Sequence, residues 1–191
     1  MTKLFSYVVD HDHGYAPNPF EGFCSLAQCK FGYISNGEFR RNIVELAEKG
    51  DWIVGTGGVD LKKSAGNGTI IYAMRVADTI PLVEYNRKYK DRVDAHAGKF
   101  ESKRSALIST HFYYFGRNAI HISESPRGVA TCLEKTGPGY RSDFSEAFIA
   151  EFAEWLNATY KVGVHGLPCQ PHAELKLPVC PIQVKHQKGT K

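Results

Sequence analysis

The residues best suited to chemistry lie in one irregular stretch near the start of the chain, over positions 10–30. It reads DHDHGYAPNPFEGFCSLAQCK and holds two aspartates, two histidines, two prolines and two cysteines, without helical or strand periodicity. Loops rich in ionisable and aromatic groups are common places for binding and catalysis. We therefore expect this stretch to be a loop that lines a pocket.

Four consecutive ionisable residues open this stretch: Asp10, His11, Asp12 and His13. Neighbouring side chains on an extended chain point in alternating directions, so at most two of the four can face one metal ion. We expect no metal and no cofactor here. Instead, one aspartate and one histidine should face the pocket, and His11 should contact the ligand. If the pocket is catalytic, His13 or the distant His111 acts as general base. Asp10 or Asp12 then orients that histidine.

The next residues, Tyr15 to Phe20, form an aromatic loop stiffened by two prolines. Asn18 precedes Pro19, which biases its backbone toward an extended form and presents its amide outward. An amide offers both donors and an acceptor, which suits the edge of a nucleobase. Tyr15 and Phe20 are the expected stacking partners. The structural alternative is that Asn18 only satisfies the backbone of its own loop.

A second segment, GDWIVGTGG at 50–58, is typical of a short buried strand that ends on glycines. Trp52 is placed to stack on a planar ligand, and it is equally suited to the core. Thr56 and Gly57 are expected to form a pocket wall, where exposed backbone N–H groups can meet a phosphate. The segment lacks both the Walker and the Rossmann glycine patterns.

A third segment, STHFYYFG, places His111 and Tyr113 on one face of a strand, where both can contact one ligand. The other face is expected to be core. Arg117 and Asn118 follow at a turn, within reach of a phosphate or a base. Arg141 lies in the loop GPGYRSD, just before a predicted helix N-terminus that favours anions.

The order of predicted elements indicates an α+β fold, with a small mixed β-barrel or a strongly curved sheet and flanking helices. Strands are expected over 4–10, 51–57, 69–80, 106–116, 118–122 and 128–135. Helices are expected around 39–47 and from a capping box of Asp143 and Glu146 onward. The stretch 81–104 should be largely solvated. We expect one domain over 1–170, then an extended, proline-containing segment and basic tail over 171–191.

The composition fits a globular protein of 191 residues with a formal net charge of +4. This mildly basic balance permits contact with nucleic acid without requiring it. No apolar run approaches the roughly 18 residues needed to cross a membrane. Five cysteines, an odd number, argue against a disulfide framework and favour a reducing, cytoplasmic setting.

Four segments of the sequence carry a resemblance to known domains. GDWIVGTGG followed by IIYAMRVADTIPLVEY resembles the PUA-like domains, the group that includes EVE, ASCH and YTH modules. Together with DHDHGYAPNPFEGFCSLAQCK and STHFYYFGRNAIHI, the chain resembles the nucleotide modification associated domain 2 family over about residues 4–170. That bacterial and phage family is named for its genomic association with DNA-modification systems. The resemblance implies a PUA-like barrel and a role in DNA modification or phage defence.

The leading hypothesis is a protein that binds a nucleobase or nucleotide, modified or not, free or flipped out of DNA. The cleft would be formed by residues 10–20, 50–58 and 111–118. One alternative is an enzyme that acts on the nucleotide in the same cleft through a histidine–aspartate pair. A second alternative is a protein-interaction module that uses the proline-rich C-terminal segment.

Overall fold

A mixed seven-stranded sheet forms the centre of the computed structural model, which describes residues 2–27, 33–35, 38–40, 43–95, 105–126, 133, 137, 139–175 and 177. The strand order is β11 (Tyr140–Arg141), β1 (Leu4–Val9), β5 (Trp52–Gly57), β6 (Thr69–Arg75), β9 (His111–Tyr114) and β12 (Gly163–Val164), and β10 (Ile120–His121) pairs with β6. β1 is parallel to β5 and β12 is parallel to β9, whereas the other pairs are antiparallel. The strand order does not close between β11 and β12. Within the described residues the α+β class is therefore confirmed, and a closed PUA-like barrel is not.

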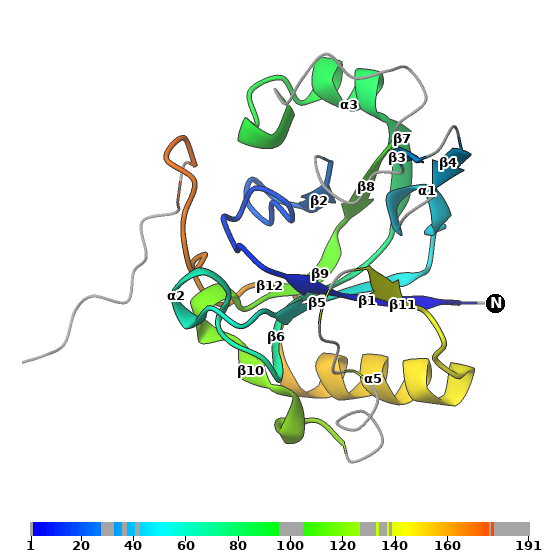
Figure 1. Cartoon of the computed structure of the whole chain (residues 1–191), viewed down its shortest axis with the longest axis vertical. Coiled ribbons are helices and arrows are strands. Elements are labelled where there is room, and N and C mark those ends of the chain that lie inside the picture. Colours follow the sequence, from blue (N-terminus) through cyan, green and yellow to red (C-terminus); the bar gives the residue numbers. More distant parts are fainter. Residues whose placement is uncertain are drawn as a thin grey trace, which may run out of the picture.

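A smaller antiparallel sheet covers one face of the central sheet, and a long helix covers the other (Figure 1). The small sheet has the order β2 (Cys24–Leu26), β8 (Ser105–Ser109) and β7 (Asp78–Pro81). Near it lie α1 (Ile43–Leu46), α3 (Leu82–Lys88), the 3-10 turn η1 (Val93–Ala95) and the hairpin of β3 (Tyr33–Ser35) with β4 (Glu38–Arg40). The long helix on the opposite face is α5 (Glu146–Thr159). Its buried residues Phe148, Phe152 and Leu156 form a core with the central sheet, against which Trp155 is only partly buried.

Several predicted elements have different boundaries in the structure. The single strand expected over 69–80 is divided, because β6 ends at Arg75 and β7 belongs to the small sheet. The helix expected from about residue 39 begins only at Ile43. α5 is capped by Ser145, whose hydroxyl accepts from the Phe148 N–H at 3.2 Å, whereas Asp143 pairs with Arg141. The strand expected over 128–135 falls almost wholly outside the described residues.

The loops between the strands of the central sheet contain short helical elements that the sequence did not indicate. Residues 58–68 hold a short helix, α2 (Leu61–Ser64), whose cap Asp60 accepts from the Lys62 N–H at 2.9 Å. Two further 3-10 turns, η2 (Gly116–Asn118) and η3 (Ile122–Glu124), flank β10. Along the described part of the chain, no helix has the length and apolar character needed to cross a membrane.

Arg92 and Asp94 are buried, although they lie in the stretch that was expected to be largely solvated. Arg92 is 3% exposed and pairs with the buried Asp94, with Nε 3.2 Å from Oδ1. Its guanidinium also donates to the carbonyls of Asn18 and Phe20, at 3.0 and 2.5 Å. Tyr85 donates to Asp94 at 2.8 Å. A buried charge is tolerated when its hydrogen bonds are made in this way, and this one fixes the loop at 18–20.

We expect Arg92→Met to destabilise the fold strongly, because it leaves the Asp94 carboxylate buried without its cation. The loss in the free energy of unfolding should be about 3–5 kcal/mol, measured by urea denaturation. Lys63→Met is the matched control, since Lys63 pairs with Asp60 at 3.4 Å on the surface with side chains 45% and 47% exposed. For Lys63→Met, the loss in the free energy of unfolding should stay below about 1 kcal/mol. Similar losses for the two variants would contradict a structural role for the buried pair.

Candidate functional site

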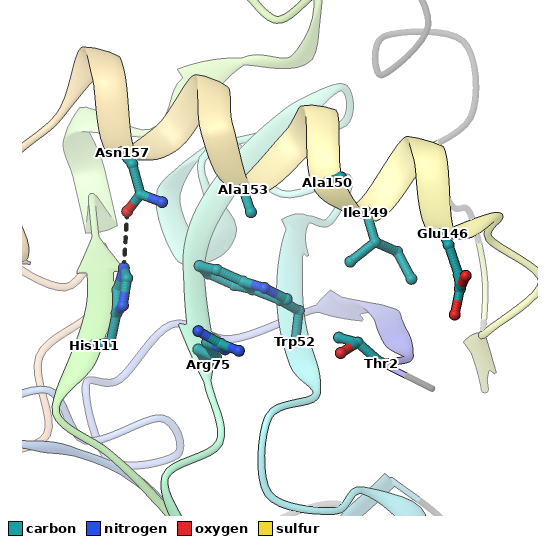
Figure 2. Close-up of a pocket in the computed structure, with 9 residues that line it drawn as sticks. All are labelled: Thr2, Trp52, Arg75, His111, Glu146, Ile149, Ala150, Ala153 and Asn157. Carbon is teal, nitrogen blue, oxygen red and sulfur yellow. Dashed lines mark hydrogen bonds between the residues drawn. The ribbon is translucent and has the colours of Figure 1, made fainter.

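A pocket of about 300 Å³ lies between α5 and the central sheet (Figure 2). Its lining residues are Thr2, Trp52, Arg75, His111, Glu146, Ile149, Ala150, Ala153 and Asn157. The helix leaves this space because it presents two alanines here, whereas its phenylalanines fill the neighbouring core. The pocket is therefore a consequence of side-chain size along one helix.

Three adjacent strands place three different side chains in a row across the floor of this pocket. Trp52 of β5 is the register partner of Arg75 of β6, and Arg75 is the register partner of His111 of β9. Partners in register extend from the same face of a sheet, so an aromatic ring, a guanidinium and an imidazole lie side by side. The rings of Trp52 and His111 meet edge to face, with centroids 5.5 Å apart.

A hydrogen-bonded group of three side chains closes one end of the pocket. The Tyr113 hydroxyl donates to Asn157 Oδ1 at 2.6 Å. His111 Nε2 lies 3.0 Å from the same oxygen and 3.1 Å from the Tyr113 hydroxyl. Burial raises the pKa of Tyr113, so its hydroxyl keeps its proton at neutral pH. His111 and Tyr113 are thus held together on one strand face, as their alternation predicted.

Opposite charges lie at separate places in the pocket. Arg75 is exposed, and with the described residues its guanidinium makes one long hydrogen bond, from Nε to the Gly50 carbonyl at 3.4 Å. Glu146, the first residue of α5, lies at the far end from His111 and Asn157, with Trp52 between them (Figure 2). The site therefore offers hydrogen-bond donors at one end and a carboxylate at the other.

Asp12, a predicted acid–base residue, lies on the opposite side of the sheet from this pocket. It is 1% exposed, and its carboxylate accepts from the Tyr114 hydroxyl at 2.5 Å and from the Cys169 N–H at 3.0 Å. Tyr114 follows Tyr113 on β9, so its side chain extends from the other face of the sheet. The structure therefore does not bring Asp12 to His111.

The rest of the ionisable loop is held by the C-terminal segment, not by the pocket. His13 Nδ1 lies 2.7 Å from the Gln170 carbonyl, and its ring stacks on His11 with centroids 5.7 Å apart. Asp10 is exposed. Among the described residues, no hydrogen bond or ion pair joins Asp10 or Asp12 to either predicted general base, and no three potential metal ligands gather at one point.

The contacts of Asn18 are of the kind that its structural alternative expects, and its role toward a ligand stays a prediction. It is 2% exposed, its Nδ2 donates to Asp94 at 3.1 Å, and its Oδ1 accepts from the Phe20 N–H at 3.1 Å. Phe20 packs edge to face on Tyr114, with centroids 6.0 Å apart, and Tyr15 contacts His172. These aromatic side chains are separated from the pocket by the central sheet.

The remaining predicted ligand contacts are also spread over the fold. Thr56 is buried and donates to the Tyr7 carbonyl at 3.2 Å, and a Cβ on Gly57 would lie only 1.9 Å from the Gly66 carbonyl oxygen. Arg117 and Asn118 donate to the carbonyls of Pro168 and His165, at 3.2 and 2.8 Å. Arg141 pairs with Asp143 at 3.2 Å. Only Trp52, His111 and Tyr113 of the predicted set meet at the α5 pocket, and the roles of the others stay predictions.

The sequence reasoning assigned no chemistry to α5 and none to Arg75. On the helix, Glu146, Ala150, Ala153 and Asn157 recur at intervals of three or four residues, which places them on one stripe. This stripe of small and polar residues runs beside the apolar stripe, and it is the signal that could have indicated a pocket. No comparable local pattern surrounds Arg75, whose position depends on pairing with two distant strands.

The Asp12 carboxyl has a pKa raised above its usual range by burial, although hydrogen bonds from Tyr114 and Cys169 oppose the shift. A carboxyl with a higher pKa in the folded state binds its proton more tightly there, so acid favours folding through this group. The contribution is complete below the unfolded-state pKa of about 3.9 and is lost as the pH rises through the folded-state pKa.

Asp12→Asn should remove this pH dependence. We expect the free energy of unfolding of the wild type, relative to the variant, to fall between about pH 3.5 and pH 7. Urea denaturation of both proteins at several pH values measures this difference. A difference that is constant or that grows with pH would contradict the burial of an ionisable carboxyl at this position.

Together these features define a mixed α+β domain with one aromatic and polar pocket between its sheet and its long helix. The model of the nucleotide modification associated domain 2 family matches residues 1–99 and 94–175, so the chain belongs to this family. The predicted family is thereby confirmed, and its description indicates a role in nucleotide-modification systems. No curated protein and no solved structure matches the chain.

Proposed function

We propose that the α5 pocket binds the base of a nucleotide, modified or unmodified, either free or unstacked from DNA. The observation that carries this proposal is the row of Trp52, Arg75 and His111 across three strands, with Asn157 above it. An aromatic contact to a base is worth about 1–3 kcal/mol and tolerates different bases. The polar groups around the ring, with the Arg75 guanidinium among them, supply hydrogen bonds to the base edge.

The size of the pocket supports a small planar ligand. Its volume of about 300 Å³ lies at the lower limit of ligand pockets, which is about 300–1,000 Å³. A second hollow of about 510 Å³ adjoins it and shares Thr2 and Glu146 with it. This hollow is also lined by Lys3, Tyr140 and other residues near the start of α5. A base in the first pocket therefore has space beside it for its sugar and phosphate, or for the next nucleotide.

The surroundings of His111 favour binding over acid–base catalysis. Its two polar partners, Tyr113 and Asn157, are neutral, and the aspartates expected to orient it lie elsewhere. The proposed setting is DNA modification or defence in bacteria or phage, which the family description supports only at the level of nucleotide modification. The proline-containing segment near residue 170 contacts its own domain, which argues against the interaction-module alternative.

The direct test is retention of a ligand by the purified protein. We would incubate the protein with a pool of nucleosides, nucleotides and short modified DNAs, filter by size and analyse both fractions by mass spectrometry. A species retained unchanged supports the proposal and names the ligand. A new mass in the filtrate would replace it with an enzymatic function, and no retained or altered species would overturn it.

Filling the pocket should abolish this retention without unfolding the protein. Ala153→Leu adds a larger side chain over Trp52 and keeps high helix propensity, so we expect at least a tenfold loss of affinity. Ala158→Leu is the matched control, because Ala158 is on the same helix but does not line the pocket. Calorimetric titration with the retained ligand measures the affinity of each variant. Circular dichroism confirms that each variant is folded. Equal affinities for the two variants would contradict binding at this site.

A further inference from the structure

The orientation of the Asn157 amide follows from its short contact with Tyr113, because a separation of 2.6 Å suits an O–H···O bond better than an N–H···O bond and so places Oδ1 at the hydroxyl. The Tyr113 hydroxyl has one proton and donates it to Asn157 Oδ1 at 2.6 Å. The hydroxyl oxygen can then only accept further hydrogen bonds. His111 Nε2 lies within 3.1 Å of this oxygen and 3.0 Å of Asn157 Oδ1, and both offer only lone pairs to it. Nε2 must therefore carry a proton, and Asn157 Oδ1 receives two donors.

The amide nitrogen of Asn157 consequently points away from these partners. Figure 2 shows it on the side of Trp52, while the oxygen is directed to His111. Among the described residues, no protein group accepts from this nitrogen, which carries two N–H donors. Arg75 lies beside His111 on the neighbouring strand, and its terminal guanidinium nitrogens likewise have no acceptor within the described chain.

This end of the pocket therefore presents donors in excess. Asn157 and Arg75 are exposed, so water can accept from their donors in the free protein. A ligand edge that displaces this water must bring hydrogen-bond acceptors, because an amino group in its place would leave the covered donors unsatisfied. Nucleobases differ in this respect: uracil, thymine and hypoxanthine carry a carbonyl oxygen where cytosine and adenine carry an amino group.

We propose that the pocket selects bases with a carbonyl oxygen at the edge that faces Asn157 and Arg75, over their amino counterparts. The inference rests on the proposed function and specifies its ligand class. Tyr113 and His111 act as positioning residues, since they orient the Asn157 amide. Asn157 itself is the specificity-determining contact.

The test uses two matched pairs of ligands, UMP with CMP and IMP with AMP, titrated calorimetrically into the full chain. Each pair exchanges one carbonyl for one amino group and, beside it, one ring N–H donor for a ring nitrogen acceptor; agreement between the pyrimidine and the purine pair assigns the preference to this shared exchange. We expect at least a tenfold lower Kd for the carbonyl member of both pairs. Binding of all four with equal Kd, or tighter binding of CMP and AMP, would overturn this inference and leave the proposed function in place. No binding of any nucleotide would overturn both.

Two variants test the residues named. Asn157→Asp still accepts from Tyr113 and His111 but replaces the N–H donors with a carboxylate oxygen, so the UMP/CMP preference should disappear or reverse. Ala158→Asp is the control for the added charge and should keep the preference. Tyr113→Phe removes one donor that orients the amide, and the ratio of the two Kd values should fall severalfold. A ratio unchanged in both Asn157→Asp and Tyr113→Phe would overturn the assignment.

Discussion

The Ser109 hydroxyl holds the corner at which two paired strands pass from one sheet to the other. It donates to the Arg75 carbonyl at 2.6 Å and accepts from the His111 N–H at 3.1 Å, and the side chain is fully buried. On one side of this corner β7 pairs with β8, and on the other β6 pairs with β9. The register of Arg75 with His111, and hence the row of side chains beneath α5, depends on this turn in the chain.

The two faces of β9 separate two kinds of polar chemistry. His111 and Tyr113 extend toward α5, where a pocket remains open to ligands. Tyr114 extends to the other face and meets the buried Asp12. Asp12 of the first loop and the buried pair of Arg92 and Asp94 anchor loops to the core. On one face of the sheet, polar and ionisable side chains therefore stabilise the fold. On the other face, such side chains line the candidate site.

Local pattern predicted the elements whose stability is local. β1 was predictable from its β-branched and aromatic run, β5 from its short apolar run before glycines and α5 from the helical spacing of its apolar residues, and the alternation on β9 placed His111 and Tyr113 together. The division of residues 69–80 could not be predicted in this way, because both halves have strand propensity. The change of sheet at Ala77 is set by a hydrogen bond from its N–H to the distant Ile108 carbonyl. The structural role of Asp12 could not be predicted from local sequence, because its partners Tyr114 and Cys169 lie more than 100 residues away in the chain.

The loop that follows β1 is held in place by a segment far along the chain, around residues 170–175. Gln170 and His172 donate backbone hydrogen bonds to the carbonyls of Asp12 and His13, at 2.9 and 3.0 Å, and Leu175 packs against the same core. Such contacts between distant positions form late and slow the search for the native state. During synthesis, Asp12 can find its final partners only after residue 169 has left the ribosome. The loop after the first strand therefore stays incompletely packed until residues 169–172 have been made.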